Sequence, residues 1–193
     1  MASILILHSS VDGHTIRICN RLKQVIEESG TNEANGLQVV VRSIDDSSQS
    51  DLSSFDKIVI GASIRYGKHR QSVYDFIDHH LPLLQSRENA FFSVNIVARK
   101  AEKNQPETNP YLCKFLQQIV WRPNRVAVFA GKLDYPKYGF VDRHMIRLIM
   151  WITGGPTDPA TVIEYTDWQM VEAFGRDLGR SLTPGLPSVP DAL

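Results

Sequence analysis

The sequence has few cysteines and no arrangement of them that indicates a cross-link or a metal. Its two cysteines, Cys19 and Cys113, form no CxxC pair and lie near no spaced histidines. This pattern argues against a disulfide framework and against a zinc site, and it favours a reducing compartment. We therefore expect a protein that holds no metal.

Neither charge is in excess, and long apolar runs are missing. Lys and Arg total 21, and Asp and Glu also total 21, so no overall field favours nucleic acid as a partner. No stretch reaches the ~18 consecutive apolar residues that span a bilayer. The first residues, MASILILHSS, have no basic region and only a short apolar run, which predicts a first strand rather than a signal peptide and hence a cytoplasmic protein.

What the sequence does contain is a regular alternation of short apolar runs and amphipathic segments. Strands are predicted at residues 3–7, 37–41, 57–60, 91–95 and 126–130. Helices are predicted around residues 16–26, 73–81, 111–120 and 168–182. Most of the strand runs are continuously apolar, as in parallel sheets that are buried on both faces. The sequence therefore predicts an α/β fold with a doubly wound, five-stranded parallel sheet.

The fifth predicted strand is unusual, because about thirty residues separate it from TVIEYT, the next stretch typical of a strand. We interpret residues 132–160 as an insertion that interrupts the fifth strand. The rest of residues 1–182 then forms one domain. The stretch 183–193 is rich in Pro and Ser, and we expect it to be a disordered tail.

The loop after the first strand opens directly into the first helix and has the chemistry of a phosphate site. It consists of Ser9, Ser10, Val11, Asp12, Gly13, His14 and Thr15. A helix N-terminus offers unpaired N–H groups, a glycine permits close backbone approach, and the hydroxyl groups are donors. The alternative is a capped helix start without a ligand. The loop matches neither GxGxxG nor GxxxxGK[ST], so fingerprints for dinucleotides and ATP are missing.

Two further loops follow predicted strands, where ligands bind in open α/β sheets. The first contains Ser63, Ile64, Arg65, Tyr66 and Gly67, and the second contains Asn95, Ile96, Val97, Ala98, Arg99 and Lys100. Tyr66 has an aromatic ring suited to stacking on a flavin. The alternative is that Tyr66 only packs and that the cations are solvated. We favour a binding role because all three loops should converge on one edge of the sheet.

The insertion has a local excess of positive charge. Its cations are Lys132, Lys137, Arg143 and Arg147, against Asp134 and Asp142. A helix predicted over residues 141–152 has an apolar face formed by Val141, Met145, Leu148, Ile149 and Ile152. Arg143, His144 and Arg147 lie on the opposite face, with Trp151 on the polar side, and we expect the two arginines to be exposed. The pattern indicates a role toward substrate or membrane, with an ordinary solvated face as the alternative.

Several motifs in this order resemble a known family. The stretch ILHSSVDGHTIRICNRL resembles the flavodoxin signature at Ser10, Gly13, Thr15 and Leu22, and departs from it at His8 and Cys19. The further motifs are GASIRYG, SVNIVARK, WRP, the Tyr-Pro of LDYPKY, DRHMIRLIM, TGGPTD and YTDW. Together they resemble the bacterial menaquinone-dependent protoporphyrinogen IX dehydrogenases of the long-chain flavodoxin group, over residues 4–178.

This resemblance implies a heme-biosynthesis enzyme that binds FMN noncovalently and oxidises protoporphyrinogen IX to protoporphyrin IX. Electrons would then pass to menaquinone or another respiratory quinone. The phosphate loop would be residues 9–15, and the isoalloxazine loops would be residues 63–67 and 95–100. We expect a peripheral location at the inner face of the cell membrane. The resemblance assigns no catalytic base, and a homo-oligomer stays open.

Three other functions stay open at this stage. A soluble flavodoxin-type electron carrier would convert no small molecule, but such carriers tend to be acidic because their partners are basic. The balanced charge and the basic insertion argue against it. A generic FMN-dependent NAD(P)H:quinone reductase would require turnover of a nicotinamide. A noncatalytic porphyrin chaperone would require a degenerate flavin loop.

Overall fold

A computed structural model describes residues 2–30, 37–46 and 52–180, and the predicted tail at residues 183–193 lies outside them. It contains a parallel five-stranded sheet in the order β2-β1-β3-β4-β5. These strands are β1 (Ser3–Ser9), β2 (Gln38–Ser43), β3 (Lys57–Ser63), β4 (Glu88–Asn95) and β5 (Arg125–Ala130). The order is that of flavodoxin-type doubly wound sheets, so the predicted fold class is confirmed.

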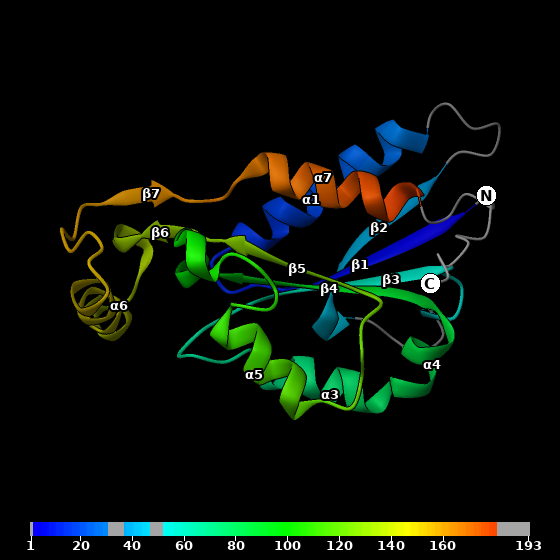
Figure 1. Ribbon diagram of the computed structural model, residues 1–193, viewed down its shortest axis with the longest axis horizontal. Coiled ribbons are helices and arrows are strands. Elements are labelled where there is room, and N and C mark those ends of the chain that lie inside the picture. Colours follow the sequence, from blue (N-terminus) through cyan, green and yellow to red (C-terminus); the bar gives the residue numbers. More distant parts are fainter. Residues whose placement is uncertain (1, 31–36, 47–51, 181–193) are drawn as a thin grey trace, which may run out of the picture.

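Helices cover both faces of this sheet (Figure 1). These helices are α1 (His14–Gly30), α3 (Gln71–His79), α4 (Leu81–Ser86), α5 (Pro110–Gln118) and α7 (Trp168–Arg180), whereas α6 (Phe140–Ile152) lies beyond the end of the sheet. Along β1, Ile4 and Ile6 pack toward α1 and α7, whereas Leu5 and Leu7 pack toward α3, α4 and α5. Because successive side chains of a strand point to opposite faces, burial of both faces requires the continuous apolar runs seen in the sequence.

The insertion forms a separate small unit beyond the carboxyl ends of the strands (Figure 1). It begins with β6 (Lys132–Asp134) and ends with β7 (Val162–Glu164), and these two strands pair antiparallel with each other. The predicted strand TVIEYT therefore lies within this unit as β7. It does not re-enter the main sheet, as the second half of an interrupted fifth strand would. The two ends of the unit meet, because the Tyr165 N–H donates to the Gly131 carbonyl at 3.2 Å.

Helix α6 is turned the opposite way from the sequence-based expectation. Arg143 donates to the carbonyl oxygens of Tyr135 and Tyr138 at 3.2 and 3.1 Å, and Arg147 donates to that of Thr157 at 2.8 Å. The expectation that both arginines are exposed is therefore wrong. Loops on either side of α6 present carbonyl groups that need donors, and a guanidinium supplies several at once.

The outward side of α6 is apolar instead. Its exposed residues include Phe140, Val141, Met145, Leu148, Ile149, Trp151 and Ile152. Within α6 only Met150 is fully buried. Helical periodicity identified the apolar residues Val141, Met145, Leu148, Ile149 and Ile152 as one face, but it carries no information on which side faces the protein. Trp151, which was predicted on the polar side, is exposed together with these residues.

Candidate functional site

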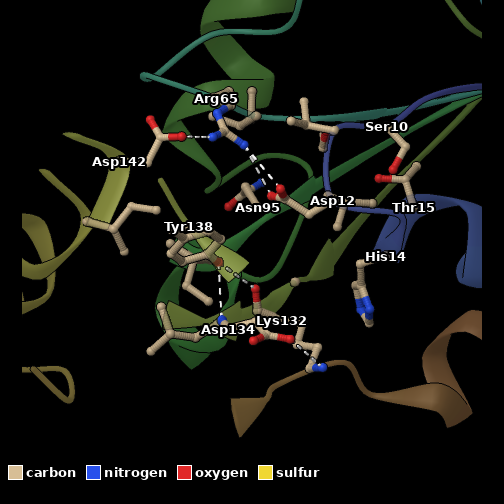
Figure 2. Close-up of a pocket in the computed structure, with 18 of the residues that line it drawn as sticks. Ser10, Asp12, His14, Thr15, Arg65, Asn95, Lys132, Asp134, Tyr138 and Asp142 are labelled. Atoms are coloured by element: carbon tan, nitrogen blue, oxygen red, sulfur yellow. Dashed lines mark hydrogen bonds and ion pairs between the residues drawn. The ribbon is translucent and has the colours of Figure 1, made fainter. Parts of the chain in front are cut away.

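A cavity of about 410 Å³ opens at the carboxyl edge of the sheet. Its walls are the loop after β1, the loop after β3, the end of β4, strand β6 and the edge of α6 that carries Asp142, Met145, Ile146 and Ile149. Figure 2 shows these segments facing one another across the cavity. The parallel topology explains this, because every strand of the sheet ends at the same edge and delivers its following loop there.

The loop between β1 and α1 is shaped for close approach of a ligand. Gly13 has a φ of +81°, and a Cβ added to it would have no neighbour within 4 Å. The Gly13 N–H donates to Ser10 Oγ at 3.1 Å, which fixes the turn just before the helix. The first N–H groups of a helix have no partner within it and carry the positive end of its dipole. The loop therefore combines open space and donors, as a phosphate group requires.

His14 supplies a polar atom that lacks a partner. Its Nε2 lies 2.6 Å from Thr166 Oγ1, and the Thr166 hydroxyl donates to the Ala130 carbonyl at 2.7 Å, so Nε2 must be the donor to Thr166. Nδ1 is buried and has no hydrogen-bond partner among the residues that the structure describes. Burial lowers the pKa of His14, which favours the neutral ring. Because His14 lines the cavity, this orphaned nitrogen fits a ligand with polar groups.

The loop after β3 presents an aromatic ring on a strained turn. Arg65 and Lys68 exchange backbone hydrogen bonds of 2.9 and 3.2 Å across Tyr66 and Gly67, whose φ angles are +52° and +78°. Two successive positive φ angles are typical of a tight type I′ turn, and this conformation is unfavourable for a tyrosine. The side chain of Tyr66 remains largely exposed beside the cavity, where it is available to stack on a flat ligand.

Arg65 connects three segments around the cavity (Figure 2). Its Nη1 lies 3.2 Å from the Asp12 carboxylate in the loop after β1, and its Nη2 pairs with Asp142 on α6. Asp142 also accepts a hydrogen bond from the Tyr66 hydroxyl. That hydrogen bond and the charge of Arg65 lower the pKa of Asp142. The guanidinium thus holds α6 over the cavity.

The loop after β4 contributes less than its sequence suggested. Asn95 Oδ1 accepts from the Ala98 N–H at 3.0 Å and caps a short 3-10 turn. Arg99 turns toward the end of α6, where it donates to Thr153 Oγ1 at 2.9 Å. Of the stretch 95–100, only Asn95 and Ile96 line the cavity.

The wall formed by the insertion is polar at its centre. Asp134 is buried, and Lys132 Nζ lies 2.8 Å from its Oδ2, while Lys137 Nζ lies 3.8 Å from the same oxygen. The hydrogen bond from Lys132 lowers the pKa of Asp134 and keeps the carboxylate ionised. The Tyr138 hydroxyl donates to the Lys132 carbonyl and accepts from the Asp134 N–H, both at 3.3 Å. These bonds hold the wall in place.

The structure brings together most, but not all, of the residues that the sequence singled out. Lining the cavity are Ser10, Val11, Asp12, Gly13, His14, Thr15, Ser63, Ile64, Arg65, Tyr66, Gly67, Asn95, Ile96, Lys132 and Lys137. Outside it lie Ser9, Val97, Ala98, Arg99, Lys100, Arg143, Arg147 and Trp151. Sequence reasoning assigned no site role to the lining residues Arg17, Tyr111, Leu133, Asp134, Tyr138, Asp142 and Ile146. The lining residues Met145 and Ile149 belong to the apolar face of the insertion helix, for which a role toward substrate or membrane was predicted. In the sequence, Asp134 and Asp142 stood out only as acidic residues that partly balance the cations of the insertion.

Known proteins resemble the chain over most of its length. A family model described as a flavodoxin domain matches residues 5–160. Protoporphyrinogen IX dehydrogenase (quinone) of Escherichia coli strain K12 is 43% identical over 174 residues, which cover 90% of this chain and 93% of that protein. The protein of the same name from Leishmania major is 40% identical over 189 residues, covering 97% and 79%.

A solved structure supports the fold independently. A flavodoxin from the domain Archaea superposes with a TM-score of 0.52 at 16% identity, covering 93% of this chain and 97% of that one. At this identity the likeness bears on the fold alone.

Proposed function

The chain belongs to the flavodoxin-domain family, among the protoporphyrinogen IX dehydrogenases (quinone), and we propose that it oxidises protoporphyrinogen IX to protoporphyrin IX in heme biosynthesis. The acceptor of the electrons is a respiratory quinone, with menaquinone as the proposed one. The observation that carries this proposal is the identity of at least 40% to enzymes of that name over nine-tenths of the chain.

We propose FMN as the cofactor, and the residues that line the cavity support it. The N-terminus of α1, with Gly13 and the hydroxyl groups of Ser10 and Thr15, would hold the phosphate, and Tyr66 would stack on the ring. A phosphate loop without a dinucleotide fingerprint supports a mononucleotide. When bound, FMN supplies two-electron chemistry between the porphyrinogen and the quinone. The chain would position each substrate for this chemistry.

The two substrates would use the cavity in turn. Its walls carry polar groups from the loops and apolar groups from α6, such as Met145 and Ile149. A large apolar macrocycle and a quinone ring both suit such a surface. We therefore expect ping-pong kinetics, in which each two-electron oxidation of the porphyrinogen is followed by reduction of one quinone, so that three quinones are consumed for each protoporphyrin IX formed.

A test of this function compares electron donors and acceptors in one preparation. We expect the purified protein to release FMN rather than FAD on denaturation, and to oxidise protoporphyrinogen IX rapidly only when a menaquinone analogue is present. NADPH should support little turnover. Equal rates of quinone reduction with NADPH would instead favour the NAD(P)H:quinone reductase, and flavin reduction without porphyrinogen turnover would favour the electron carrier.

Helix α6 supports a peripheral location at the inner face of the cell membrane. Its outward side carries Phe140, Leu148 and Trp151 in exposed positions. Met145 and Ile149 are both exposed and part of the cavity wall, so apolar surface continues from outside into the cavity. A quinone dissolved in lipid would have an apolar route to the site. The exposed apolar side of α6 would lie at the surface of the lipid. Among the described residues, no helix is long and apolar enough to cross a bilayer.

A further inference from the structure

The cations of the cavity differ in how fully they are already paired. Arg17 lies 2.6 Å from Glu164, and Arg65 is shared between two carboxylates. Lys132 makes a 2.8 Å ion pair with the buried Asp134. A cation that already makes a close ion pair must weaken that pair when it binds a new anion. These three residues are therefore poor first contacts for a negatively charged substrate.

Lys137 is the exception among the cavity cations. In the part of the chain that the structure describes, the only carboxylate within ion-pair distance of its ammonium is Asp134, at 3.8 Å. That carboxylate already accepts from Lys132, so two ammonium groups share a single negative charge. The side chain of Lys137 is 64% exposed, which leaves its ammonium free to turn toward a ligand. The cluster formed by Lys132, Lys137 and Asp134 thus carries one unit of uncompensated positive charge.

The surroundings of Lys137 match an apolar ring that bears an acid. Met145 and Ile146 of α6 line the same cavity, next to the wall that contains Lys132 and Lys137. Arg143 and Arg147 offer no alternative, because their donors are bound to backbone carbonyls. The substrate of the proposed function has this combination of a macrocycle and two propionate groups.

We propose that Lys137 is the residue that recognises a propionate of the porphyrinogen, with the Lys132–Asp134 pair as its fixed support. This assignment rests on the proposed function and adds the determinant of substrate specificity. An ammonium bound to a carboxylate is a charge-assisted hydrogen bond, which is stronger than a neutral one. Lys137 contributes to substrate binding and takes no part in electron transfer.

The test compares Lys137→Gln with wild type in the flavin-loaded protein, using protoporphyrinogen IX and its dimethyl ester. For the diacid we expect KM to rise about tenfold with little change in kcat. KM for the ester and KM for the quinone should stay unchanged, because neither ligand carries the carboxylate. Lys137→Arg should restore most of the affinity. Lys114→Gln removes an exposed lysine of α5 outside the cavity, and serves as the matched control.

Equilibrium binding gives a second readout that does not depend on turnover. Protoporphyrin IX carries the same two propionates, so its affinity for the flavin-loaded protein, measured by fluorescence, should also fall about tenfold in Lys137→Gln. An unchanged affinity and KM for the diacid would overturn the assignment, as would a loss of FMN affinity, which would place Lys137 at the cofactor. Binding of porphyrin by a wild type that never oxidises porphyrinogen would contradict the proposed function alone.

Discussion

The backbone conformation of Gly13 should determine how well the loop binds its ligand. Its φ of +81° is readily adopted by glycine, whereas an L-residue there costs about 1–2 kcal/mol. In Gly13→Val we expect the affinity for FMN to fall at least about tenfold, because the loop would leave its present conformation or crowd the phosphate. Fluorescence titration of FMN into the apoprotein measures the change.

Gly139 provides the control for this substitution. It also has open space around its Cβ position, but its φ is −58°. Gly139→Val should therefore retain FMN affinity. Equal losses in both variants would show that the conformation of Gly13 has no special part in binding.

His69 predicts a specific dependence of stability on pH. It is buried against Phe91 and Phe115, its Nδ1 lies 3.2 Å from the Ser63 carbonyl, and desolvation lowers its pKa to about 4. The unfolded chain binds this proton near pH 6.5, before the folded protein does. The free energy of unfolding is therefore fully retained above pH 6.5 and falls by about 1.4 kcal/mol per pH unit on the way down to about pH 4.

The contribution of His69 to the pH dependence of stability is obtained by comparing wild type with a variant that lacks this histidine. Denaturant unfolding of wild type and His69→Gln at several pH values between 7.5 and 4.5 should show a shallower slope for the variant. Other histidines with lowered pKa values, such as His14 and His80, act in both proteins and cancel. Parallel curves would mean that the pKa of His69 does not differ between the folded and the unfolded chain.

At the scale of elements, the inward position of the arginines of α6 determines how their replacement should affect the stability of the insertion. Arg143 and Arg147 satisfy carbonyl groups on both sides of the helix. Changing both to Gln should leave partly buried acceptors unpaired, at a cost of about 1–3 kcal/mol for each group. Hydrogen exchange in residues 132–164 should become faster while the amides of β1 and β3 stay protected. Unchanged exchange in the insertion would contradict this account.

The outward side of α6 should control association with lipid. Burying a large apolar side chain contributes about 1.5–3 kcal/mol, so Leu148→Ser with Trp151→Ser should lower binding to lipid vesicles at least tenfold in a sedimentation assay. Raising the salt concentration should have little effect, because the arginines of α6 point inward. Val120→Ser removes an exposed apolar residue from another part of the surface and is the control. Loss of binding with salt but not with the double variant would refute an apolar mode of attachment.

The elements were predictable from the sequence to different degrees. The strands and the helices that cover the sheet follow from apolar periodicity, because each has one orientation that buries its apolar residues. Helix α6 lacks that constraint, since its apolar side is left outside and its arginines are satisfied by carbonyls within the insertion. The contact of Arg99 could not be predicted for another reason. Its partner Thr153 is distant in sequence and near only in space.

For the whole molecule, topology explains why the site could be anticipated in part. Parallel strands in the order 2-1-3-4-5 deliver the loops at residues 9–15 and 63–67 to one edge, whatever their detailed sequence. The remaining wall comes from the insertion. No local pattern shows that Asp142 of α6 meets Arg65, or that Asp134 lies between two lysines.

The two ends of the insertion adjoin each other at the edge of the core fold. The chain leaves the core fold at Gly131 and returns at Tyr165, where a hydrogen bond of 3.2 Å joins the two points, and Thr166 is bonded to Ala130 beside them. A segment with adjoining ends can be removed without moving a strand of the sheet. The wall of the cavity that the insertion forms is therefore separable from the core fold. Joining Gly131 directly to Tyr165 should give a folded protein that has lost its means of recognising a porphyrinogen.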